Sequence, residues 1–152
     1  MATTSTLIDD FTAVVHLPVD PDTVMGWFTS PAGVSRWWGP TQGDGSIGGT
    51  LETSFGEHGV NAMRVLETST TRVLWESVVP EGSTPTGHTQ EWLGTRMEFD
   101  VAPADVGTEL RFRHAGLTPR LQCWEACVDA WSYFMTSIEA LARTGTGTPF
   151  AG

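Results

Sequence analysis

The sequence contains no lysine. All eight of its basic residues are arginines, against 18 acidic residues, and the formal net charge is −10. Nucleic-acid binding and anchoring to anionic lipid both need clustered positive charge, so this composition argues against both. The missing lysine also excludes Schiff-base chemistry and the GxxxxGK[ST] phosphate-binding loop.

Long apolar runs are absent and cysteine is scarce. No segment approaches 18 consecutive apolar residues, so we expect no membrane span, and Met1 to Thr6 lacks the basic and apolar regions of a secretory signal. The two cysteines, Cys123 and Cys127, are four residues apart, which on a helix is a poor geometry for a disulfide. We therefore expect reduced thiols in a cytoplasmic protein. Structural zinc needs about four ligands, and that helix holds no histidine, so we expect no metal.

Familiar catalytic motifs are missing as well. The chain has no GxSxG and no HExxH, and the glycines between positions 43 and 49 lack the strand-to-helix context of a dinucleotide fingerprint. The four histidines are too scattered for a metal site. We expect no cofactor, and the absence of these motifs favours a binding protein over an enzyme.

Tryptophan is present in excess. The chain has seven, together with seven phenylalanines and one tyrosine. Its 152 residues make one domain and suffice to bury a core of this aromatic volume. We predict a single domain over residues 1–152, with flexible tails at 1–8 and 146–152.

Hydrophobic periodicity predicts a strand, two short helices, five antiparallel strands and a long helix. Asp20-Pro21 and Ser30-Pro31 are typical starts of the short helices, because each pairs an N-cap residue with a proline at the first helical position. Alternating apolar residues predict strands at 11–17, 50–55, 60–68, 72–79, 90–101 and 108–114, and 41–49 is loop by composition. Apolar steps of three and four predict the amphipathic helix 119–143. Together they predict an α+β fold in which a curved antiparallel sheet wraps around the C-terminal helix.

The chain resembles a known group in a series of short motifs. They are Pro18-Val19-Asp20-Pro21-Asp22, Arg36-Trp37-Trp38-Gly39-Pro40, Gly48-Gly49, Gly107-Thr108, His114-Ala115-Gly116-Leu117, Ala130-Trp131 and Thr144-Gly145-Thr146-Gly147-Thr148-Pro149. In this order they resemble the START-related, polyketide-cyclase-like SRPBCC superfamily, and within it the bacterial branch of the heat-shock-protein ATPase activator homologue family. The resemblance implies a helix-grip fold. Alanine stands at position 130 where that family usually has glycine, so we expect the helix to approach the sheet less closely.

The helix-grip fold implies a cavity between the concave face of the sheet and the long helix, where a small apolar ligand would sit. The alternative is a core filled by the same aromatic residues. Buried tryptophan needs a partner for its indole N–H, which favours a cavity rim or water over a dry core. We predict a lining of Trp37, Trp38, Trp75, Leu93, Thr95, Met97, Phe99, Phe112, His114, Trp124, Cys127, Val128, Trp131 and Met135.

Three functions fit this sequence. The first is binding of a small hydrophobic or aromatic molecule, such as a lipid or polyketide, without catalysis. The second is a cyclase or dehydratase with His114, Glu91 and Arg64 as candidate catalytic residues. The third, by family name only, is a co-chaperone-like interaction module. A homodimer through the sheet edge or the short helices is compatible with each of them.

The candidate polar residues also have structural interpretations. His114 alternates inward with Leu110 and Phe112, so it suits either acid–base chemistry or a core hydrogen bond. Glu91 suits a pocket carboxylate or a solvated rim position. Arg64 and Arg96 suit a ligand carboxylate, although Arg96 falls opposite the apolar face, where it would pair with glutamates.

Overall fold

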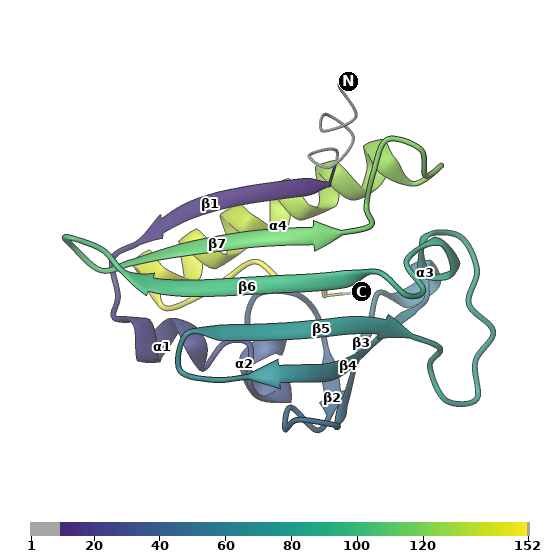
Figure 1. Cartoon of the computed structure of the whole chain (residues 1–152), viewed down its shortest axis with the longest axis horizontal. Coiled ribbons are helices and arrows are strands. Elements are labelled where there is room, and N and C mark those ends of the chain that lie inside the picture. The colour runs from purple at the N-terminus through teal and green to yellow at the C-terminus, as the bar shows by residue number, and fades with distance from the viewer. Residues whose placement is uncertain (1–9, 152) are drawn as a thin grey trace, which may run out of the picture.

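The computed structural model describes residues 10–151 (Figure 1). The elements in chain order are β1 (Phe11–Leu17), α1 (Pro21–Met25), α2 (Pro31–Ser35), β2 (Thr41–Gly43), β3 (Thr50–Ser54), the 3-10 turn η2 (Gly56–His58), β4 (Val60–Thr68), β5 (Arg72–Val78), α3 (His88–Glu91), β6 (Arg96–Pro103), β7 (Thr108–Ala115) and α4 (Trp124–Thr144). The α+β architecture predicted from periodicity is therefore confirmed.

The sheet has seven antiparallel strands in the order β1-β7-β6-β5-β4-β3-β2. One strand more than predicted is present, because Thr41 to Gly43 pair with Thr53 to Leu51 at the edge of the sheet. Three residues are too few to produce a visible alternation, so the sequence pattern showed only loop there. A bulge between Val65 and Glu67 interrupts the pairing of β4 with β5, and such bulges increase the local twist.

The short helices begin where the capping residues predicted. The Asp20 side chain accepts a hydrogen bond from the backbone N–H of Thr23 at 3.2 Å, and Ser30 accepts one from Gly33 at 3.0 Å. Pro21 and Pro31 occupy the first turns. These two helices place Trp37 and Trp38, which follow α2, inside the core.

The long helix α4 lies along one face of the sheet (Figure 1). Its core-facing side chains Trp131, Met135 and Ile138 are buried. The helix starts at Trp124 rather than at position 119. Trp124 and Val128 therefore lie in its first two turns, and both are only partly buried. Among the helices of residues 10–151, none combines the length and the apolar character needed to cross a membrane.

The strand β6 begins six residues later than the predicted 90–101. Residues 88–91 form the short helix α3, and Gly94, at φ 83°, turns the chain into the strand. Leu93 consequently lies in this turn with 36% of its surface exposed, instead of facing the interior. An apolar alternation that happened to continue through the turn made the predicted strand too long.

The C-terminal residues 146–151 differ from the flexible tail that the composition predicted. Gly145 adopts φ 83° and ends α4, and the chain then returns along the helix. The backbone N–H of Thr148 donates to Ser137 Oγ at 2.8 Å, and that of Phe150 donates to the Trp38 carbonyl at 3.0 Å. We call residues 146–151 the C-terminal strap. The other predicted tail, 1–8, lies outside the described residues, as does residue 152.

Candidate functional site

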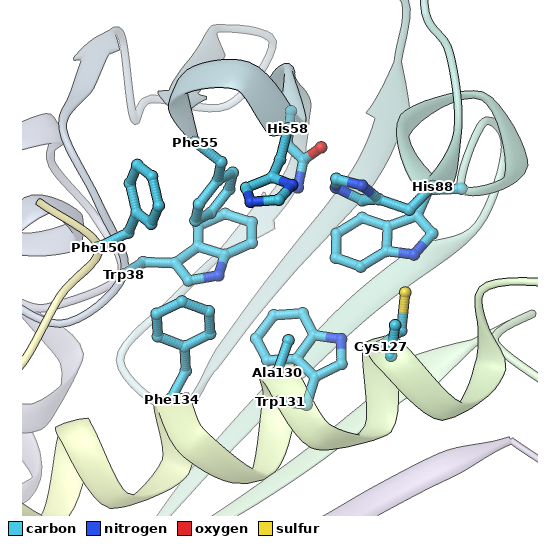
Figure 2. Close-up of a pocket in the computed structure, with 12 residues that line it drawn as sticks. Trp38, Phe55, His58, His88, Cys127, Ala130, Trp131, Phe134 and Phe150 are labelled. Atoms are coloured by element: carbon cyan, nitrogen blue, oxygen red, sulfur yellow. The ribbon is translucent and has the colours of Figure 1, made fainter. Parts of the chain in front are cut away.

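A pocket of about 310 Å³ opens at one end of the space between α4 and the sheet. This volume is at the lower end of the range usual for small-molecule sites. Figure 2 shows α4 along one side, with Phe55 and His58 opposite and Phe150 of the strap beside them. The lining consists of Trp38, Phe55, His58, Asn61, His88, Trp92, Ala126, Cys127, Ala130, Trp131, Phe134 and Phe150.

Three parallel indoles form one wall of the pocket. The ring of Trp131 stacks on Trp38 with centroids 5.4 Å apart and an interplanar angle of 16°, and on Trp92 at 5.8 Å and 5°. Trp38 stacks in turn on Trp75, which is fully buried behind the wall. These stacked rings give the pocket an apolar wall, which suits an apolar aromatic ligand.

A chain of hydrogen bonds outside the pocket runs from the indole of Trp131 to the backbone carbonyl of Trp92. Trp131 Nε1–H donates to His114 Nδ1 at 3.0 Å, so His114 Nε2 must carry the imidazole proton and donate to Thr95 Oγ1 at 2.8 Å. The Thr95 hydroxyl then donates to the Trp92 carbonyl at 2.6 Å. His114 is 0% exposed, and burial lowers its pKa to about 3 against the opposing effect of the Asp10 charge. The imidazole is therefore neutral and positions Trp131.

Unpaired polar atoms gather at the pocket. Three side chains of the described residues have buried polar atoms without a hydrogen-bond partner: Asn61, Trp75 and Trp92. Two of them, Asn61 and Trp92, line the pocket. An orphaned buried polar group costs about 1–3 kcal/mol, so these atoms are sites where a ligand would find free hydrogen-bonding capacity.

Two histidines stand at the mouth of the pocket. Figure 2 shows the rings of His58 and His88 facing each other there. His58 is exposed and His88 is partly buried. Burial lowers the pKa of His88, the charge of His58 lowers it further, and the charge of Glu91 opposes both. Arg, Asp and Glu are all missing from the lining among the described residues, so the lining contains no carboxylate and no guanidinium.

The two cysteines occupy the start of α4. Burial raises the pKa of the Cys123 thiol to about 12 and also raises that of Cys127, so both are protonated and poorly nucleophilic. Only Cys127 lines the pocket. Within residues 10–151 no three His, Cys, Asp or Glu side chains come together as metal ligands would have to.

The predicted lining residues fall into two groups. Trp38, Cys127 and Trp131 line the pocket. The others lie elsewhere, either inside the core, at its edge or in the turn that contains Leu93: Trp37, Trp75, Leu93, Thr95, Met97, Phe99, Phe112, His114, Trp124, Val128 and Met135. Phe99, for example, packs against Phe28, Trp75 and Phe112 with ring centroids 4.4–5.0 Å apart. Most of the space between sheet and helix is therefore filled, and the pocket occupies one end of it.

The three candidate catalytic residues do not converge. His114 is saturated by Trp131 and Thr95 and lies outside the pocket lining. Glu91 Oε1 accepts a hydrogen bond from the backbone N–H of Cys123 at 3.2 Å, and Arg64 is exposed on the outer face of β4. Arg96 lies on the same outer face, 3.7 Å from Glu76, as its alternation predicted.

Several residues that line the pocket were not predicted from the sequence. Ala126, Ala130 and Phe134 lie on α4 beside the apolar stripe, at spacings of four from one another. Ala130 is one of these lining residues, so its methyl group borders the pocket. Asn61 alternates with Met63 and Val65 on the inner face of β4, which was a usable signal. His58 and Phe150 come from a turn and the strap, where no periodicity exists.

Comparison with solved structures identifies the fold. The solution structure of the Aha1 dimer from Colwellia psychrerythraea matches with a TM-score of 0.77 and 21% sequence identity, over 91% of this chain and 98% of that one. The crystal structure of CalU16 from Micromonospora echinospora matches with a TM-score of 0.68 and 18% sequence identity, over 91% of this chain and 76% of that one. The crystal structure of DynU16, from the dynemicin biosynthetic locus, matches with a TM-score of 0.70 and 19% sequence identity. The match covers 91% of this chain and 49% of that one.

These matches confirm the predicted helix-grip fold, with an Aha1 protein among the structural neighbours. No protein-family model matches the sequence, and no curated protein matches it either. A shared fold does not carry an activity with it, so function has to be argued from the pocket.

Proposed function

We propose that the protein binds a small apolar, aromatic molecule in the pocket at the end of α4. The observation that carries the proposal is a pocket of about 310 Å³ whose walls are almost entirely aromatic rings and small side chains. A concave, mostly apolar opening of this size is typical of sites that bind small molecules. One structural neighbour comes from a biosynthetic locus, which suits a small organic ligand such as a polyketide.

Binding without catalysis is the form of this function that the side chains favour. An acid–base mechanism needs at least two polar groups within reach of one substrate atom. The candidates Glu91 and Arg64 point elsewhere, and His114 is committed to Trp131 and Thr95. An interaction surface for a chaperone has less support. The exposed large apolar side chains come from different strands, loops and helices: Val14, Ile47, Val79, Leu93, Val106 and Tyr133.

A titration with N-phenyl-1-naphthylamine, a neutral dye that fluoresces in apolar sites, tests the proposal. We expect saturable binding to the wild-type protein, with competition by aromatic metabolites or fatty acids. Ala130→Leu places a larger side chain on the pocket wall and is expected to weaken dye binding by about tenfold or more, roughly 1.4 kcal/mol.

Ser132→Leu is the matched control for that variant. Ser132 is exposed on the same helix and lies outside the pocket lining, so the new leucine should leave dye affinity unchanged. The proposal fails if the wild-type protein shows no saturable binding, or if both variants bind the dye as tightly as the wild type while melting normally.

We further propose a cytoplasmic location and a homodimer. The free thiols Cys123 and Cys127 suit a reducing compartment. The Colwellia neighbour is described as a dimer, and strands β1 and β2 leave the sheet with two open edges. Light scattering coupled to size exclusion at several protein concentrations tests the assembly.

A further inference from the structure

Among the described residues that line the pocket, Asn61 is the only one with a primary amide, and most of its neighbours in the lining are aromatic rings. It is the second residue of β4, on the inner face with Met63 and Val65, and is 3% exposed. Both its Oδ1 and its Nδ2 lack hydrogen-bond partners. A leucine of similar size would fill this position without an unpaired polar group, so the amide brings no evident benefit to the protein on its own.

The hydroxyl of the residue opposite Asn61 on the neighbouring strand is hydrogen-bonded to another residue. Thr53 pairs with Asn61 in the register of β3 and β4. The Thr41 hydroxyl donates its proton to the Gly39 carbonyl at 2.8 Å, so Thr53 Oγ1 must donate its own proton to Thr41 Oγ1 at 2.7 Å. Neither hydroxyl bonds to Asn61, and both the donor and the acceptor of its amide are unpaired in the pocket wall.

We infer that the ligand is a planar aromatic molecule carrying a neighbouring hydrogen-bond donor and acceptor, such as a ring lactam or a carboxamide, that pairs with the Asn61 amide. This inference rests on the proposed function and specifies its ligand class. A cis amide presents N–H and C=O side by side in one plane, which is the complement of the Asn61 side chain. The stacked indoles of Trp38, Trp131 and Trp92 accommodate the flat ring.

The same geometry discriminates against charged ligands. A carboxylate has no proton to donate, so it would leave Asn61 Oδ1 unpaired. It would also enter a pocket with no arginine among its described lining residues and with His88 kept neutral by burial. Burying an unpaired charge is far more costly than burying a neutral amide that finds its partner.

Two probes of the same bicyclic shape test this inference. 2-Quinolinone carries the lactam, whereas naphthalene has the ring system without polar groups. Displacement of N-phenyl-1-naphthylamine from wild-type protein is expected to favour 2-quinolinone by about tenfold, since two hydrogen bonds form to an amide that had none. In Asn61→Leu this preference should be lost or reversed, because the lactam would bury its N–H and C=O without partners while naphthalene binds at least as well as before.

Stability measurements separate recognition from a structural role. Because Asn61 has no hydrogen bond to lose, Asn61→Leu should melt no lower than the wild type. Asn61→Val is a second variant that also removes the amide, with a side chain that is favourable in a strand. Arg64→Leu, on the exposed face of the same strand, controls for an added leucine and should keep the preference for the lactam.

Four outcomes would overturn the inference. Equal affinity of the wild type for both probes, or a lactam preference that survives both Asn61 variants, shows that the amide does not recognise the ligand, while the proposed function stands. A melting temperature lowered by several degrees with both probes weakened equally shows a structural asparagine. If neither probe nor the dye binds the wild type, the proposed function fails and this inference fails with it.

Discussion

The Trp131 indole nitrogen donates a hydrogen bond over 3.0 Å to Nδ1 of His114, a residue that lies outside the pocket whose wall Trp131 forms. The histidine is completely buried, and its other nitrogen donates to Thr95. Since Nδ1 has to stay unprotonated to accept from the indole, protonation of His114 would break this bond. The position of a pocket wall is thereby coupled to the charge of a core histidine.

This coupling predicts a loss of stability in mild acid. His114 has a pKa of about 3 when folded, against about 6.5 when unfolded, so its neutral form stabilises the fold fully above pH 6.5 and progressively less below it. The contribution should fall by roughly 1.4 kcal/mol per pH unit between pH 6 and pH 4. Urea unfolding of the wild type and of His114→Gln at several pH values measures the difference.

The glutamine variant keeps a donor and an acceptor but cannot titrate, so its stability should depend less steeply on pH. His16→Gln is the control, because His16 is exposed on β1 and its removal should leave the slope intact. His88 acts in the same direction as His114 and is present in all three proteins. Parallel pH profiles for the wild type and the His114 variant would contradict this account.

A second prediction concerns Ser137, a buried hydroxyl on α4. Its Oγ donates to the Trp37 carbonyl at 2.8 Å and accepts from the N–H of Thr148 at 2.8 Å. Ser137→Ala leaves both backbone groups without this partner, so we expect the free energy of unfolding to fall by about 1–3 kcal/mol. Ser132→Ala, at an exposed position of the same helix, should change it by less than about 0.5 kcal/mol. Equal effects of the two would show that the strap contact contributes nothing.

The fold was predictable because its signals are local and repeated. The alternation in β4 and β5 placed those strands within one residue of their observed bounds, and the Asp20 and Ser30 caps located α1 and α2. The inward position of His114 also followed from alternation. Its partners did not, because the contact with Trp131 depends on how α4 crosses the sheet, which no local pattern encodes.

The pocket was harder to predict than the fold. Seven tryptophans indicated an aromatic interior, yet composition does not say which rings pack on each other and which border a space. Trp75 and Trp131 have the same residue type and similar burial, but only Trp131 lines the pocket. The strap was missed for a related reason. Its docking depends on Ser137, which looks like an ordinary polar helix position in the sequence.

A third prediction follows from the strap, which carries Phe150 to the pocket. Phe150 packs against Phe55 with ring centroids 5.6 Å apart, and the Tyr133 hydroxyl donates to the Thr148 carbonyl at 2.8 Å. Phe150→Ala should widen the opening and speed the dissociation of N-phenyl-1-naphthylamine in stopped flow. Tyr133→Phe should have the same effect to a smaller degree.

Thr146→Ala is the control for the strap variants, because this exposed residue precedes the anchored part of the strap. Its dissociation rate should match that of the wild type. If Phe150→Ala also leaves the rate unchanged, the dye leaves by another route and the strap does not restrict access to the pocket.

The last prediction concerns the thiols of Cys123 and Cys127. Burial raises the pKa of Cys123 to about 12 and raises that of Cys127 as well, so very little thiolate exists at pH 8. The thiolate is the reactive form, and its nucleophilicity rises only partly with its pKa. In the folded protein Cys123 should therefore react with Ellman's reagent roughly thirtyfold to a hundredfold more slowly than in the unfolded chain, and Cys127 should also react more slowly. The single variants Cys123→Ser and Cys127→Ser show which thiol accounts for which part of the reaction time course. Rapid reaction of either thiol in the folded protein would contradict a packing role and would point instead to a reactive group at the start of α4.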